Sequence, residues 1–311
     1  MILLSGASGY IGRKILDSQC SNIDAVIGRD HLVGFNGQFL IHDFSQKSDP
    51  IFSLNNVKTI IHCAARNHIL NDSSIDPLSE YRKTNTFGTL RFAQYAANAG
   101  VKRFIFISSI KVNGESTSIG SKFTSADEMS PEDPYGVSKA EAEEGLLEIS
   151  KETGMEVVII RPPLVYGPRV KGNFLNLLKL SKLPIPLPFA LINNKRSMVY
   201  LDNLVDLIIT CIDHPKAANR VFLASDCDDL SLARLLTLMR QTMNKSPLLL
   251  PIPSFLFNLL SKLSGKSELV NRLIGNLQVD SSDAKALLGW QPPYTVEQGV
   301  KATVDDFLKN N

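Results

Sequence analysis

A tyrosine and a lysine four residues apart, Tyr135 and Lys139, follow the Ser108-Ser109 pair, with Tyr135 lying 26 positions after Ser109. On a helix, residues four apart share one face. A lysine cation beside a phenol is expected to pull the tyrosine pKa below its ordinary value of about 10. Such a tyrosine can exchange a proton near neutral pH while a serine hydroxyl binds the same substrate oxygen. Ser109, Tyr135 and Lys139 are therefore the catalytic candidates.

The motif alone is also typical of an ordinary aromatic at a helix start with a solvated lysine. The rest of the sequence therefore has to decide between this interpretation and a catalytic pair. Three glycines at positions 6, 9 and 12 follow the apolar run at residues 2–4 and open a helical pattern. This spacing permits a tight turn and the close approach of a pyrophosphate, which the helix N-terminus favours. We expect a dinucleotide to be held here by Gly6, Ser8, Gly9, Tyr10, Ile11 and Gly12.

The residues after the second expected strand, at 25–27, bear on the choice between NAD and NADP. An acidic side chain after the second strand suits the ribose 2′-hydroxyl of NAD, whereas an arginine suits the 2′-phosphate of NADP. Arg29 is the first polar side chain there and Asp30 follows it, which tilts the prediction toward NADP. Asp43 lies where a carboxylate can meet the adenine amino group, although a plain strand-end aspartate is equally typical.

Short apolar runs alternate with helical patterns along the first two thirds of the chain. Strands are expected at residues 2–4, 25–27, 59–62, 103–107, 157–160 and 220–224. Helices are expected at residues 86–99, 138–153, 231–243 and 296–307. Continuous apolar strands between helices are typical of a parallel sheet covered on both faces. The predicted fold class is therefore α/β, with a Rossmann-type doubly wound parallel sheet.

Prolines become frequent after about Arg161, and the expected elements shorten there. We expect a nucleotide-binding domain over residues 1–168, with a returning segment near 200–225. A smaller substrate-binding lobe is expected over residues 169–199 and 226–311. The active site is expected in the cleft between the two parts.

Composition limits the class of protein. The 311 residues are 44% hydrophobic and 21% charged, as in an ordinary globular protein, and a net charge of +2 gives no argument for nucleic acid. The four cysteines and five histidines show no metal-ligand spacing, so no metal is expected. No apolar run approaches the ~20 residues that span a bilayer. These features favour a cytoplasmic protein with reduced thiols and no membrane span.

With the glycine loop, Ser109, Tyr135 and Lys139 in this order, the chain resembles the extended short-chain dehydrogenase/reductase family over nearly its whole length. Further matching segments are residues 61–65, 85–89, 107–109, 161–168, 196–203 and 288–292. Within that family it is most similar to UDP-glucose 4-epimerase-like proteins and to the UDP-4-keto-sugar reductases that form UDP-N-acetylquinovosamine. The resemblance implies a UDP-sugar substrate and, as a family expectation, a homodimer.

The resemblance also implies roles for single residues. Ser109 would hydrogen-bond the C4 oxygen of the sugar, Tyr135 would exchange its proton, and Lys139 would hold the nicotinamide ribose. The other residues that the resemblance places at the cofactor are Ala64, Ala65 and Pro162, and those at the substrate are Arg66, Lys111, Asn173 and Arg196. A planar arginine fork matches diphosphate oxygens; a surface charge is the alternative for Arg196.

Two departures from the family pattern leave the sugar open. The family segment usually ends Val-Tyr-Gly, whereas this chain has Asn113 before the glycine. Lys111 adds a cation two residues after Ser109, which either touches the substrate or turns to solvent. His68 is a further candidate to line the sugar pocket, although a structural histidine is the more typical interpretation.

Three reactions at the sugar can be compared. Relatives that are 4,6-dehydratases carry Asp-Glu where this chain has Ile110 and Lys111, so elimination is disfavoured. An epimerase returns the hydride to the other face of C4 and keeps its NAD, whereas a reductase consumes NAD(P)H in each turnover. Arg29 and the local resemblance favour reduction of a UDP-4-keto-6-deoxy-N-acetylhexosamine in surface-polysaccharide biosynthesis. A UDP-glucose or UDP-N-acetylglucosamine 4-epimerase is the alternative, followed by a non-catalytic NADP-binding redox sensor.

Overall fold

A seven-stranded parallel sheet forms the centre of the protein, with the strand order β3-β2-β1-β4-β5-β6-β9. The computed structural model describes residues 1–18, 22–48, 50–67, 74–253, 257, 270 and 273–310. The strands of this sheet are β1 (Ile2–Ser5), β2 (Ala25–Gly28), β3 (Gln38–Ile41), β4 (Thr59–His62), β5 (Arg103–Ile107), β6 (Glu156–Arg161) and β9 (Arg220–Leu223). This arrangement confirms the predicted Rossmann-type α/β fold.

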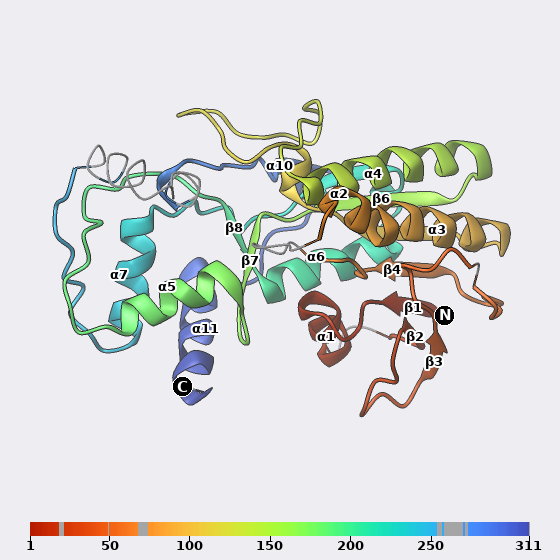
Figure 1. The fold of residues 1–311 in the computed structure, drawn as a ribbon, viewed down its shortest axis with the longest axis horizontal. Coiled ribbons are helices and arrows are strands. Elements are labelled where there is room, and N and C mark those ends of the chain that lie inside the picture. Colours follow the sequence, from red (N-terminus) through yellow and green to blue (C-terminus); the bar gives the residue numbers. More distant parts are fainter. Residues whose placement is uncertain are drawn as a thin grey trace.

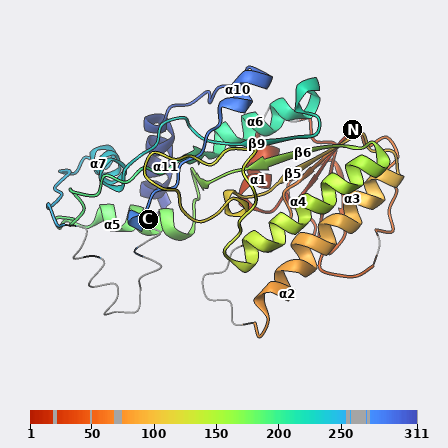
Figure 2. The same ribbon diagram turned by 90° about the horizontal axis from the view of Figure 1, so that it is seen from above.

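Helices cover both faces of the sheet (Figures 1 and 2). One face carries α1 (Tyr10–Asp17), α6 (Leu201–Asp213) and α10 (Ser282–Leu288). The other carries α2 (Pro77–Tyr81), the π-helix η1 (Arg82–Gly88), α3 (Thr89–Asn98) and α4 (Pro134–Thr153). Because both faces are buried, the strands are apolar at nearly every position, as the sequence pattern predicted.

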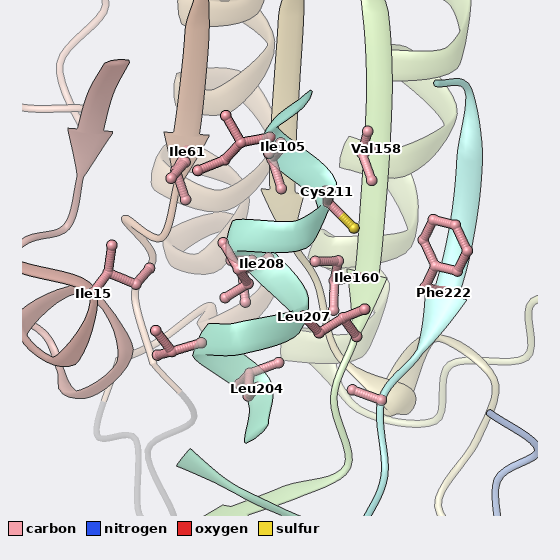
Figure 3. Packing of buried hydrophobic residues seen from close by; sticks show 14 of the residues in the cluster. Ile15, Ile61, Ile105, Val158, Ile160, Leu204, Leu207, Ile208, Cys211 and Phe222 are labelled. Carbon is pink, nitrogen blue, oxygen red and sulfur yellow. The ribbon is translucent and has the colours of Figure 1, made fainter. Parts of the chain in front are cut away.

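The core under α6 shows how the helices are fixed to the sheet. Figure 3 shows Leu204, Leu207, Ile208 and Cys211 of α6 directed at the sheet, at the spacing of one helix face. They meet strand residues from β4, β5, β6 and β9, and each labelled residue of this cluster is at most 5% exposed. Each Å² of apolar surface that is buried in this way stabilises the fold by about 25 cal/mol.

The C-terminal part gathers around a second cluster of buried side chains. A two-stranded parallel sheet of β7 (Leu164–Tyr166) and β8 (Met198–Tyr200) leads into it. Three helices complete it: α5 (Gly172–Lys182), α7 (Leu232–Thr242) and α11 (Val296–Asn310). These helices lie at the opposite end of the molecule from β1, β2 and β3 (Figure 1). The division into two functional lobes remains a prediction.

Most expected elements begin and end within a few residues of their sequence-based bounds. The helix expected from residue 86 begins with η1 at Arg82, four residues early, and α4 likewise begins at Pro134, four residues before its expected start. Asp133 explains the earlier start, since its side chain accepts a hydrogen bond from Gly136 N and proline suits a first helical position. The expected helix at 86–99 is partly the π-helix η1. Two short 3₁₀ helices, η2 (Ile110–Val112) and η3 (Pro215–Ala217), complete the connections.

No helix in the part of the chain that the structure describes is long and apolar enough to cross a membrane. His68, the candidate for the sugar pocket, lies outside the described residues.

Candidate active site

The candidate site lies at the carboxyl ends of the parallel strands. β1 pairs with β2 on one side and with β4 on the other, so the connections after β1 and β4 leave in opposite directions. Ligands of open α/β sheets bind in the crevice at this point. The predicted cofactor residues follow β1, β2, β3, β4 and β6, and Ser109 follows β5. The fold therefore brings segments from most of the sheet to one edge.

The glycine turn after β1 fits a pyrophosphate. Gly6 has a φ of +72°, and a Cβ atom there would lie 2.6 Å from the backbone nitrogen of Ala64. A Cβ on Gly12 would lie 2.2 Å from the carbonyl oxygen of Gly6. Gly9 caps α1 without a side chain, and no acidic residue occurs in the first turn. The N–H groups of this turn and the helix dipole can thus receive phosphate oxygens.

Tyr10 contributes to this turn mainly through its backbone. Its ring packs against both the core under α6 and the C-terminal cluster. The hydroxyl is buried beside Gly167, and burial, followed by the charges of Asp202 and Asp306, raises its pKa. The side chain therefore joins two parts of the fold, and only the N–H of Tyr10 belongs to the N-terminus of α1.

Arg29 and Asp43 lie close together where the adenosine ribose is expected. Arg29 is exposed directly after β2. Partial burial opposes ionisation of Asp43, but hydrogen bonds from Ser45, and the nearby Arg29 and His42, outweigh it and lower the pKa of the carboxyl. An ionised Asp43 beside Arg29 offers both an acceptor and a cation to a ribose and an adenine.

Ser109 directs its hydroxyl from the start of η2. Its Oγ accepts a hydrogen bond from Lys111 N at 3.3 Å, and a hydroxyl that accepts can still donate its proton. The preceding Ser108 instead donates to Glu143 in the core. Glu143 pairs with Arg161 at 2.5 Å, and both are at most 4% exposed. Of the two serines, Ser109 is therefore the one presented to the site.

Tyr135 and Lys139 occupy the first turns of α4, because this helix begins before the expected residue 138. Lys139 is 1% exposed, and its Nζ donates to the carbonyl oxygen of Ile107 at 2.8 Å. The same ammonium lies 4.3 Å from the centre of the Phe106 ring. Burial lowers the pKa of Lys139 to about 8, against the nearby Cys63 and Glu143, which raise it. These contacts bring Lys139 to the end of β5, two residues before Ser109.

The expected effect of Lys139 on Tyr135 is wrong for this structure. The pKa of Tyr135 is raised, first by burial and then by Asp133 and Tyr81. The Tyr81 ring meets Tyr135 edge-on at 5.9 Å between centroids. The physical reason for the difference is the position of the lysine cation, which is directed at Ile107 and Phe106. In this state Tyr135 is a protonated donor.

For Asn85 the resemblance implied a structural or nicotinamide-side role and no catalytic one. It is fully buried in η1 and clamps the backbone of Arg66: Oδ1 accepts from Arg66 N at 2.8 Å, and Nδ2 donates to Arg66 O at 3.2 Å. Its amide also donates to Ser138 Oγ at 3.0 Å, which ties the loop after β4 to α4. The match of segment 85–89 to the family pattern is the sequence signal that marks it.

Lys111 and Asn113 have partners within the protein. The Lys111 Nζ donates to Glu115 Oε1 at 2.6 Å and to Asp133 Oδ2. Asn113 is buried, accepts from Arg161 Nη1 at 2.9 Å and donates to Thr124 O at 3.2 Å. Asn113 therefore completes the Glu143–Arg161 cluster, and its departure from the family pattern is structural.

The predicted substrate residues approach from three segments. The Arg66 guanidinium lies over the Tyr81 ring, 5.5 Å from its centre. Asn173 is exposed in the first turn of α5. Arg196 pairs through its backbone with Leu230, and its Nη1 donates to Gly275 O at 3.2 Å. Their joint contact with one substrate stays a prediction.

Among the described residues, no group of histidine, cysteine and acidic side chains could hold a metal ion. His62 has a structural role: its ring nitrogens bond to Ser5 Oγ at 2.8 Å and Thr89 Oγ1 at 3.0 Å. Burial, followed by the Lys139 charge, lowers its pKa to about 3, so the ring is neutral.

The fold and the candidate site define a class of protein. It is a Rossmann-type enzyme for a nicotinamide dinucleotide, with a serine, a tyrosine and a lysine as the candidate catalytic group. The family model described as "NAD dependent epimerase/dehydratase family" matches residues 2–224. The chain belongs to this family, as the sequence resemblance predicted.

Relatives match along the whole chain. A Vibrio cholerae protein named UDP-glucose 4-epimerase is 47% identical, covering 100% of this chain and 96% of its own. An Escherichia coli O157:H7 N-acetyl-alpha-D-glucosaminyl-diphospho-ditrans,octacis-undecaprenol 4-epimerase is 29% identical over 97% and 94% of the two chains. The Thermotoga maritima UDP-glucose 4-epimerase structure with UDP-glucose has a TM-score of 0.75, at 23% identity and 99% coverage of both chains. This last similarity supports the fold alone.

Proposed function

We propose that the protein is a UDP-sugar 4-epimerase that uses a retained NAD, with UDP-glucose or UDP-N-acetylglucosamine as its substrate. The observation that carries the proposal is the buried Lys139, held at the end of β5 beside Ser109 and one helical turn from Tyr135. The full-length relative at 47% identity, named as a UDP-glucose 4-epimerase, supports this reaction over the reductase that the sequence favoured.

In the proposed reaction, Tyr135 takes the proton of the C4 hydroxyl while Ser109 donates a hydrogen bond to the same oxygen. When bound, NAD would supply the redox chemistry, as the acceptor and donor of a hydride at C4. Loss of a proton and a hydride leaves a 4-keto sugar. The 4-keto sugar then rotates in the site. Tyr135 gives its proton back to the C4 oxygen, and C4 ends with the opposite configuration.

Tyr135 must lose its proton before it can act as a base. Burial and Asp133 raise its pKa, so its ionisation needs a nearby cation, which the nicotinamide ring of NAD⁺ would supply when bound. Lys139 adds to this effect if its ammonium turns toward the ribose, away from Ile107 O.

A 4-keto-sugar reductase is the second candidate. It is supported by Arg29, which lies exposed after β2, where an arginine suits the 2′-phosphate of NADP. A 4,6-dehydratase is disfavoured, because Ile110 is 4% exposed in an apolar cluster and Lys111 is engaged by two carboxylates. Neither residue can act as the extra acid or base of an elimination.

The test is to incubate the purified protein, without added reductant, with UDP-glucose and separately with UDP-N-acetylglucosamine. We expect the C4 epimer to accumulate to equilibrium, as measured by NMR of the sugar. Oxidation of NADPH that depends on a UDP-4-keto-6-deoxy sugar, with no epimerisation of either UDP-sugar, would overturn the epimerase in favour of the reductase.

A further inference from the structure

Lys111 connects the serine and the tyrosine of the site. It lies in η2, directly after the turn that carries Ser109, and its Nζ reaches Asp133 at the N-terminus of α4. The backbones of the two elements also touch, since a Cβ on Gly136 would lie 2.8 Å from Lys111 O. A change at Lys111 therefore acts on both sides of the candidate active site.

Asp133 has two roles that conflict. Its Oδ1 accepts from Gly136 N at 2.7 Å and so begins α4, which holds Tyr135. Its negative charge, however, lies two residues before Tyr135 and opposes formation of the phenolate. Glu115 adds a second carboxylate, joined to the same lysine at 2.6 Å.

The lysine and its two carboxylates are sheltered from solvent. Their side chains are 19%, 18% and 13% exposed for Lys111, Glu115 and Asp133. Water screens such charges less than it screens surface pairs, so the cation has a larger effect on its surroundings. Tyr81 from α2 also meets Tyr135 edge-on, and the Arg66 guanidinium lies over the Tyr81 ring. Lys139, one turn further along α4, directs its ammonium at Ile107 O.

We propose that Lys111 is a positioning residue, which neutralises Asp133 beside Tyr135 and fixes the Ser109 turn to the start of α4. It does so without touching the sugar. The inference rests on the proposed role of Tyr135 and replaces the direct substrate contact expected from the sequence. It also gives a physical reason for a lysine at this position: the helix cap that aligns Tyr135 carries a charge that must be offset.

The variants Lys111→Met, Lys111→Arg and Asp133→Asn separate charge from structure. Methionine keeps an unbranched apolar stem without the charge, arginine keeps the charge, and asparagine caps a helix about as well as aspartate. In Lys111→Met we expect the pH midpoint for the basic form of Tyr135 to rise by about half a unit, so that turnover at neutral pH falls about threefold with little change in KM. Asp133→Asn should lower the midpoint, and Lys111→Arg should leave it near wild type.

The double variant Lys111→Met/Asp133→Asn tests the coupling, since removing both partners should return the midpoint toward the wild-type value. A rise in KM of tenfold or more in Lys111→Met with an unchanged midpoint would overturn the inference in favour of a substrate contact. An unchanged midpoint and an unchanged KM would overturn it as well.

A second readout needs no substrate, so it separates this inference from the proposed reaction. Difluorotyrosine introduced at position 135 has a lower phenol pKa than tyrosine, and its fluorine NMR shift follows its ionisation. With NAD present, its titration should move upward in Lys111→Met and downward in Asp133→Asn. Identical titrations in all variants would overturn the inference, even if the protein epimerises a UDP-sugar as proposed. Absence of any turnover, with shifted titrations, would overturn the proposed function alone.

Discussion

At the scale of single residues, the chemistry depends on a buried lysine and a partly buried tyrosine on one helix. Lys139 donates to Ile107 O, and burial and Asp133 raise the pKa of Tyr135, which favours the protonated phenol. Residue types and spacing indicated the candidates, Ser109, Tyr135 and Lys139, and their roles stay a prediction. The direction of the tyrosine pKa depends on burial and on the orientation of one ammonium group, neither of which the spacing contains.

Tyr135→Phe removes the proposed acid and base while keeping the ring. The ring contact with Tyr81 survives the substitution, so the fold and NAD binding should be unchanged. We expect turnover to fall by roughly 10² or more, as the loss of a general acid/base implies. Steady-state rates, with NAD binding followed by fluorescence as the control, check this; near-normal turnover would exclude Tyr135 as the proton carrier.

Lys139→Met tests the cost of the buried charge. The folded-state pKa of Lys139 is lowered from 10.5 to about 8, so between these values the unfolded chain binds more protons. The buried charge therefore lowers the free energy of unfolding by its full amount below pH 8, and this loss disappears as the pH rises to 10.5. The free energy of unfolding of Lys139→Met, relative to wild type, should be highest near neutral pH and fall across this range.

Denaturant unfolding at several pH values measures this difference. Lys151 lies exposed on the same helix, and Lys151→Met is the matched control for the loss of a lysine. A difference for Lys139→Met that stays constant from pH 7 to 10.5 would contradict the assigned cost of burial.

At the scale of elements, one buried cluster joins β6, α4 and the segment after β5. Arg161 pairs with Glu143 at 2.5 Å and donates to Asn113 Oδ1 at 2.9 Å, while Ser108 donates to Glu143. The cluster fixes the two segments that carry Ser109 and Tyr135. Its structural role could not be predicted, because its members lie up to 53 positions apart and meet only after the sheet has formed.

Breaking this pair should be costly. Glu143→Gln or Arg161→Met alone leaves a buried charge without its partner, so we expect a loss of about 3–5 kcal/mol in the free energy of unfolding. The double variant Glu143→Leu/Arg161→Met should lose clearly less than the sum of two single losses. Chemical denaturation checks both expectations; additive losses would mean that the pair is not coupled.

The strand ends explain why much of the site could be predicted. In a parallel sheet all carboxyl ends meet at one edge, so Gly6, Ala64 and Ser109 are brought near each other by strand order alone. The partners of Lys111 were not predictable, since Glu115 and Asp133 belong to an irregular segment without periodicity. The hydrogen bonds of Asn85 to the Arg66 backbone were not predictable either, because they form between a loop and a π-helix.

At the scale of the whole molecule, the proposed reaction draws residues from the sheet edge and from the C-terminal elements. The predicted cofactor residues follow strands of the large sheet, whereas Asn173 and Arg196 come from segments near α5 and β8. A 4-epimerase must hold the keto sugar while the sugar turns its opposite face toward the cofactor. The proposed function therefore requires that the hydride and the proton stay within one active site for the whole turnover.

Transfer of deuterium from C4 tests this central claim most directly. The protein is incubated with UDP-glucose, or UDP-N-acetylglucosamine, carrying deuterium at C4, and the epimer is analysed by NMR and mass spectrometry. A hydride that leaves and returns within one site predicts an epimer that keeps its deuterium at C4 in unlabelled water with no added cofactor. An epimer that has lost the deuterium, or the absence of any epimer while NADPH reduces a UDP-4-keto sugar, would contradict the account.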